Sequence, residues 1–231
     1  MTTPAVPEDV LATTRAALQT LAEHVLSKAR HVQTGRIGLR ATPGGIGTPP
    51  FPSPVDDGRE RQLRIDGTEL VVVDGDDESR APITTVRAAA AVAGVEAGAP
   101  ADVYTPHTAL DLDAHLVVDP GAVALIAAWY QLTNDALEVL RAEHAADAPS
   151  IVQLWPEHFD LAISIGECNL GGSPGDDSIT QPYLYVGPWS PPAPDGDFWT
   201  EPFGAARTRD QIPDLDAAVA FFREGLDRLP R

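Results

Sequence analysis

The chain has 231 residues, and its 34 acidic residues against 16 lysines and arginines give a formal net charge of −18. A protein this acidic, with no cluster of basic residues, is poorly suited to holding nucleic acid phosphates, so we expect no nucleic-acid partner. Hydrophobic residues make up 43% of the chain, which is enough for a substantial core and argues against wholesale disorder.

The cysteine usage and the first residues favour a cytoplasmic location. Cys168 is the only cysteine, so it cannot form an internal disulfide. The first ten residues have neither the basic nor the apolar region of a signal peptide. The longest apolar run, residues 122–130, is far shorter than the ~20 residues of a membrane-spanning helix. We therefore expect no membrane partner.

The N-terminal segment predicts an amphipathic helix over about residues 8–31, which Gly35 would end. A short strand near residues 35–40 is expected next. The glycines at 44, 45 and 47 suggest a phosphate-binding loop, but no GK[ST] sequence follows, and Pro49 and Pro50 lack the N–H groups that such a loop needs. A rigid flap is the better interpretation of this segment.

Two runs rich in β-branched and apolar residues predict a hairpin over residues 61–74, with its turn at Asp66-Gly67. We expect the acidic residues 74–79 to form a loop. The alanine-rich residues 84–93 are typical of a short helix.

Residues 110–118 alternate between apolar and polar side chains, which predicts a strand. Its polar face would carry Asp111, Asp113 and His115. Two carboxylates and an imidazole spaced in this way could bind a metal ion, or could simply be a solvated face.

Two further helices are indicated. Asp119 and Pro120 provide a strong helix start, and the segment from Pro120 to about residue 145 is apolar nearly all round. We therefore expect a core helix that is buried on all sides. After a loop, an apolar stripe predicts a last helix over about residues 214–229.

The stretch from Ile151 to Trp189 is the expected site, with strands at 151–166 and 182–188 separated by a loop. If residues 158–166 form a strand, His158, Asp160 and Ser164 share one face. Antiparallel pairing of the two strands would bring Tyr183 and Tyr185 to the same hollow. Trp155 and Trp189 complete the expected ligand contacts, although both could equally be packing anchors.

Three catalytic patterns occur in this stretch. Residues 171–175 match G-x-S-x-G, but Pro174 cannot supply the N–H of an oxyanion hole and no histidine follows Ser173. His158 and Asp160 match the start of a non-haem iron triad, but no second histidine lies later in the chain, so His107 or His115 would have to serve. Cys168 could be a nucleophile with His158 as its base, although a lone cysteine is more often buried and inert.

Four blocks carry a resemblance to a known family: LWPEHFD, SPGD, PYLYVGPW and FWTEPFGA. They resemble the signature sequences of a bacterial protein family of unknown function that is common in high-GC genomes, and the resemblance extends over most of the chain. It implies no activity, fold, cofactor or catalytic residue.

The sequence thus predicts an α+β protein with one domain over residues 1–231. A mostly antiparallel sheet and a long central helix would form the core over about 35–189, with an N-terminal helix at 8–31 and a C-terminal loop and helix at 190–231. No element of the sequence identifies a cofactor or an oligomeric state.

Two functions from different classes fit this sequence. One is an enzyme or small-molecule-binding protein with its pocket in the 151–189 stretch, where His158 would be the general acid/base and Asp160 would orient it. The alternative is a non-catalytic interaction or assembly module with an aromatic surface. Neither acidic cluster, 111–115 or 157–160, places enough ligands for a tight site, so we expect no stoichiometric metal.

Overall fold

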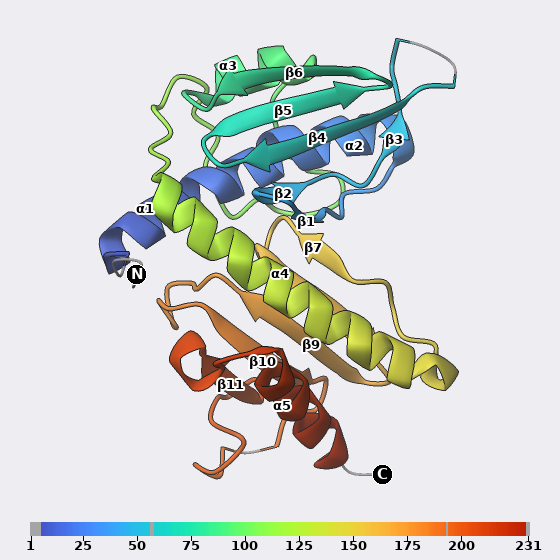
Figure 1. Cartoon of the computed structure of the whole chain (residues 1–231), viewed down its shortest axis with the longest axis vertical. Coiled ribbons are helices and arrows are strands. Elements are labelled where there is room, and N and C mark those ends of the chain that lie inside the picture. The colour runs from blue at the N-terminus through green and yellow to red at the C-terminus, as the bar shows by residue number, and fades with distance from the viewer. Residues whose placement is uncertain (1–5, 56–57, 193, 230–231) are drawn as a thin grey trace. The chain divides into compact units, whose positions relative to one another are not determined.

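The strands form two antiparallel sheets instead of the one sheet expected (Figure 1). This computed structural model describes residues 6–55, 58–192 and 194–229. The chain divides into two compact units, one made of residues 1–127 and 154–159 and the other of residues 128–153 and 160–231. The α+β class and the antiparallel pairing are confirmed. The single domain stays a prediction.

The N-terminal helix of unit 1 forms where the sequence predicts it. It consists of α1 (Glu8–Leu21), a π-helical turn (Ala22–Leu26) and α2 (Ser27–Thr34). Gly35 ends the helix in the left-handed conformation, with φ of 69°, which glycine adopts without steric cost. All five residues of the π-helical turn are buried.

The sheet of unit 1 includes the predicted hairpin and also two segments expected to be loops. Its path is β1-β2-β4-β5-β6, and β3 pairs with β4. The acidic residues after Asp74 turn back into β6, and the glycine-rich flap supplies β1, β2 and β3. The strands are β1 (Arg40–Thr42), β2 (Gly45–Gly47), β3 (Phe51–Pro52), β4 (Glu60–Asp66), β5 (Glu69–Asp74) and β6 (Asp77–Pro82).

Glycine is essential to β2 because this strand lies against the backbone of β4. A Cβ on Gly45 would lie 2.5 Å from the carbonyl oxygen of Ile65, and one on Gly47 would lie 2.6 Å from that of Leu63. The flap interpretation was wrong because glycine is usually depleted in strands, whereas here it permits the close approach.

Helices cover one face of this sheet, where Leu63 and Ile65 of β4 are buried (Figure 1). The predicted helix at 84–93 is α3 (Val86–Ala93), and the side chain of Thr85 caps it by accepting a hydrogen bond from the N–H of Ala88 at 3.1 Å. This cap fixes where α3 begins.

The strand predicted at residues 110–118 does not form. The Asp111 carboxylate accepts hydrogen bonds from the backbone N–H groups of Asp113 and Ala114, which bends the chain. His115 makes only an isolated bridge with Thr85. On the predicted apolar face, Leu110 and Ala114 are exposed and Leu116 is buried, so the alternation does not produce one continuous buried face.

Helix α4 (Pro120–Glu143) begins as predicted, and the Asp119 carboxylate accepts a hydrogen bond from the N–H of Ala122 at 2.9 Å. The expectation that it is buried on all sides was wrong, since Ala124, Ala128 and Gln131 are exposed. Small alanines on its outer face made the sequence look uniformly apolar. In the described part of the chain, no helix is long and apolar enough to cross a membrane.

The sheet of unit 2 has β8 (Asp160–Ile165), β9 (Cys168–Ser173), β10 (Tyr183–Pro188) and β11 (Ala205–Thr208) in chain order. β9 and β11 were expected to be loop. The strand expected over 151–166 is broken by a turn between β7 (Gln153–Trp155), whose residues are divided between the units, and β8. Phe159 in this turn has φ of 52°, a conformation that does not continue a strand.

The C-terminal helix α5 (Leu215–Asp227) agrees with the predicted helix, and Asp214 caps it through a hydrogen bond from the N–H of Ala217. α5 packs on β10, where Gly225 lies against Val186. Short 3₁₀ turns occur at Ala145–Asp147 and Arg209–Gln211.

Candidate functional site

Three of the predicted site residues share one face of the unit 2 sheet. Asp160 is on β8, whereas Tyr183 and Tyr185 are on β10. The predicted antiparallel pairing of these two strands was wrong, because β9 lies between them and pairs with both. The side chains nevertheless meet: the Tyr185 hydroxyl donates a hydrogen bond across β9 to the Asp160 carboxylate.

Gly171 makes this contact possible. It lies between Tyr185 and Ala162 in the register of the sheet. A Cβ at Gly171 would lie 2.6 Å from the Tyr185 hydroxyl oxygen, so any larger residue would displace the tyrosine. The neighbouring Tyr183 hydroxyl donates to the Asp176 carboxylate at 2.6 Å.

Both tyrosines are held in the neutral form. Burial raises the pKa of Tyr185 well above its ordinary value, and the negative charge of Asp160 raises it further. The pKa of Tyr183 is likewise raised, by burial first and by its hydrogen bond to Asp176 second. Near neutral pH these hydroxyls are therefore hydrogen-bond donors to carboxylates, and they are not proton acceptors.

The other predicted site residues lie apart from this pair. His158 is exposed in the turn before β8, so its expected place on a strand face with Asp160 was wrong. Trp155 lies on β7. Ser164 and Trp189 both hydrogen-bond the Asn169 side chain, at 2.8 and 3.2 Å, and Trp189 is 61% exposed.

The alternative catalytic patterns are not supported by the geometry. Burial raises the pKa of the Cys168 thiol to about 12, so this side chain is not a thiolate at neutral pH. Ser173 ends β9 and exchanges hydrogen bonds with the backbone of Gly175. Asp113 forms a two-point ion pair with Arg87. Over the described residues, no group of three or more His, Cys, Asp or Glu side chains could hold a metal ion.

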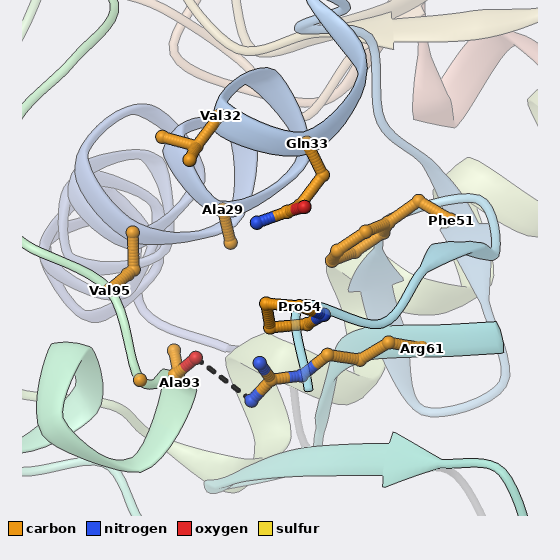
Figure 2. Close-up of a pocket in the computed structure, with 9 residues that line it drawn as sticks. Ala29, Val32, Gln33, Phe51, Pro54, Arg61, Ala93 and Val95 are labelled. Atoms are coloured by element: carbon orange, nitrogen blue, oxygen red, sulfur yellow. Dashed lines mark hydrogen bonds between the residues drawn. The ribbon is translucent and has the colours of Figure 1, made fainter. Parts of the chain in front are cut away.

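A hollow in unit 1 is a further candidate site, which the sequence analysis did not predict (Figure 2). Its volume, counted as the space open to the centre of a water-sized sphere, is about 50 Å³. It lies between α2, the segment of β3, the start of β4 and the end of α3. Its lining residues are Ala29, Val32, Gln33, Phe51, Pro54, Arg61, Ala93, Gly94 and Val95.

Arg61 supplies the charge of this hollow. Its side chain is only 12% exposed. One terminal nitrogen, Nη2, donates to the carbonyl oxygen of Ala93 at 2.9 Å, at the end of α3. Among the described residues, the buried Nε has no hydrogen-bond partner. Figure 2 shows the second terminal nitrogen pointing into the hollow.

Asp74 compensates this charge in part. It lies opposite Arg61 in the register of β4 and β5, and its carboxylate oxygen is 3.8 Å from Arg61 Nε. The Ser53 hydroxyl donates to the same carboxylate at 3.1 Å. The ion pair is therefore long, and the guanidinium keeps capacity to bind an acceptor.

The remaining walls are mostly apolar. Phe51 and Pro54 form one side, and Ala29 and Val95 face them, as Figure 2 shows. The exposed Gln33 extends its side-chain amide over the hollow from α2. An apolar wall with a few polar groups is the usual composition of a small-molecule site.

The sequence does contain a signal for Arg61. In the run RQLRID, Arg61 is in phase with Leu63 and Ile65, so it lies on the buried face of the strand. Burying a charged side chain on such a face destabilises the fold unless the charge has a partner, so its presence there suggests either an ion pair or a function.

Comparisons with family models, with curated proteins and with solved structures found no match. Membership of the high-GC bacterial family stays a prediction.

Proposed function

We propose that the protein is a small-molecule-binding protein whose ligand occupies the unit 1 hollow and bonds to Arg61. The observation that carries this proposal is the guanidinium on the helix-covered face of the sheet, with one terminal nitrogen directed into an apolar hollow. A buried cation with unused hydrogen-bonding capacity is costly for a fold. A ligand that accepts from Arg61 would offset that cost.

The lining favours binding over catalysis. An arginine stays protonated in proteins, so Arg61 cannot act as a general base. The other lining residues are an amide and apolar groups, which supply neither a nucleophile nor a proton acceptor. The proposal thus keeps the expected ligand-binding class and moves its pocket from the 151–189 stretch. A cytoplasmic location remains the prediction from composition.

A thermal-shift experiment tests the proposal with three small probes of matched size: propionate, propionamide and propylamine. The informative variant is Arg61→Met/Asp74→Asn, which removes both charges of the pair and so leaves no buried charge unpaired. The control is Arg36→Met, since Arg36 is exposed at the end of unit 1's long helix. We expect at least one probe to stabilise the wild type and the control but not the double variant. Equal responses in all three proteins would contradict the proposal.

The face of the unit 2 sheet that carries Asp160, Tyr183 and Tyr185 remains a second candidate site. On this face the two tyrosine hydroxyls donate hydrogen bonds to carboxylates. An enzyme or an interaction module that uses this face would respond differently. A probe that acts there would lose its effect in Tyr183→Phe but keep it in Arg61→Met/Asp74→Asn. The two sites are therefore separable with one set of proteins.

A further inference from the structure

We infer that the ligand of the unit 1 hollow is a short-chain monocarboxylate of about two to four carbons. The inference rests on the proposed function, because it names the class of molecule that the same hollow takes. It follows from the charge, the size and the wall chemistry of the hollow.

The charge argues for a ligand with a single negative charge. Arg61 offers one terminal nitrogen to the hollow, and Asp74 already neutralises part of the guanidinium charge at 3.8 Å. A monoanion balances what remains, whereas a phosphate dianion would add an excess charge next to Asp74. Charge-assisted bonds from a guanidinium to a carboxylate are among the stronger hydrogen bonds in proteins.

The overall charge of −18 does not oppose this site strongly. At physiological ionic strength, exposed charges more than about 8 Å away are largely screened. The local cation therefore decides which ion enters the hollow.

The size limits the ligand to a few non-hydrogen atoms. To hold one water molecule, a cavity needs about 10–15 Å³ of space open to the centre of a water-sized sphere, and the hollow offers about 50 Å³ of such space. Pockets for larger ligands usually reach about 300–1,000 Å³. Phe51, Pro54 and Val95 provide walls against which a short alkyl chain would lose its contact with water.

Gln33 completes the site from the side opposite Arg61. Figure 2 shows its amide reaching over the hollow, where its NH₂ group can donate to a carboxylate. Gln33 is exposed on α2. Its substitution should therefore leave the fold intact.

The test is a calorimetric titration with propionate, propionamide, inorganic phosphate and benzoate on the wild type, Gln33→Glu and Gln181→Glu. The last variant is the matched control, because Gln181 is exposed in unit 2 and the change in net charge is the same. We expect propionate alone to bind saturably. Gln33→Glu should weaken its binding about tenfold or more, since a second carboxylate then faces the ligand, and Gln181→Glu should leave it unchanged.

The double variant Arg61→Met/Asp74→Asn distinguishes a failure of the carboxylate assignment from a failure of the proposed function. If propionamide, phosphate or benzoate binds more tightly than propionate and loses its binding in that double variant, the carboxylate assignment is wrong while the proposed function stands. If no probe binds in an Arg61-dependent way, both fail. Propionate binding that Gln33→Glu leaves intact would contradict the assignment as well.

Discussion

The hydroxyl of Thr133 on α4 occupies the space over Gly172 of β9 that a side chain at this glycine would need. A Cβ on Gly172 would lie 2.5 Å from Thr133 Oγ1 and 2.9 Å from the nearest methyl carbon of Leu184. Thr133 is fully buried, and its hydroxyl donates to the carbonyl oxygen of Trp129 at 2.9 Å. The helix thus approaches the sheet more closely than any other residue at 172 would permit.

Gly172→Ala should therefore destabilise the protein, by about 1–3 kcal/mol as for other overpacked cores. Thr133→Ala removes two of the three atoms that the new methyl group meets, whereas the contact with Leu184 stays, so Gly172→Ala/Thr133→Ala should recover part of the loss. Urea unfolding of the two single variants and the double variant measures the coupling. Strictly additive losses would contradict the close approach.

Tyr185→Phe should lower the free energy of unfolding by about 1–2 kcal/mol, because Asp160 loses a hydrogen-bond donor inside the protein. Tyr183→Phe tests the neighbouring bond to Asp176 in the same assay. Neither change removes much apolar area, so a loss as large as that of a core truncation would point to a different role for these tyrosines.

The buried thiol of Cys168 should make the protein less stable in mild alkali. Its pKa is raised by burial from 9.0 to about 12 in the folded protein. Between these values the unfolded chain releases a proton that the folded chain keeps, so stability is full below pH 9 and falls as the pH rises toward 12. The free energy of unfolding of Cys168→Ala, measured from pH 8 to 10.5, should depend less on pH than that of the wild type.

Glu23 should be essential for holding residues 98–108 to the π-helical turn. Its fully buried carboxylate accepts hydrogen bonds from the N–H groups of His107 and Thr108, at 2.6 and 2.8 Å, and from the Thr108 hydroxyl. Glu23→Gln replaces one acceptor oxygen by a donor and should cost about 1–3 kcal/mol. Hydrogen exchange at the His107 and Thr108 amides should accelerate. Unchanged exchange would show that other contacts hold this segment.

The helices and the hairpin could be predicted from the sequence because their signals are local. The spacing of apolar residues indicates each helix. Gly35 ends the first helix, Asp119-Pro120 begins α4, and Asp66-Gly67 forms the hairpin turn, all without help from distant residues. These predictions agree with the structure to within a few residues.

The glycine-rich strands could not be predicted, because their reason lies in another part of the chain. Gly45 and Gly47 leave room for the backbone of β4. Gly171 leaves room for the side chain of Tyr185, and Gly172 leaves room for that of Thr133. In the sequence these glycines resemble loops. Residues 110–118 show the converse error, since alternation without a covering partner does not make a strand.

The candidate site was predictable only in part. The shared face of Asp160 and Tyr185 followed from the period of two, although the strand between them was missed. The hollow of unit 1 depends on α2, α3 and β4 meeting around Arg61, and no local pattern encodes that meeting. The one indication in the sequence was that Arg61 lies two residues before Leu63, which places both side chains on the same face of the strand.

The most direct test of the central claim is an NMR titration that follows the side-chain Nε–H resonance of Arg61. This group is buried and makes no hydrogen bond to any residue that the structure describes, so its signal should be distinct and should report on the guanidinium. Propionate should shift it saturably, with a Kd of about 1 mM for so small a ligand, and propionamide should not. An Arg61 resonance that stays still while other signals move would contradict a ligand site on this residue.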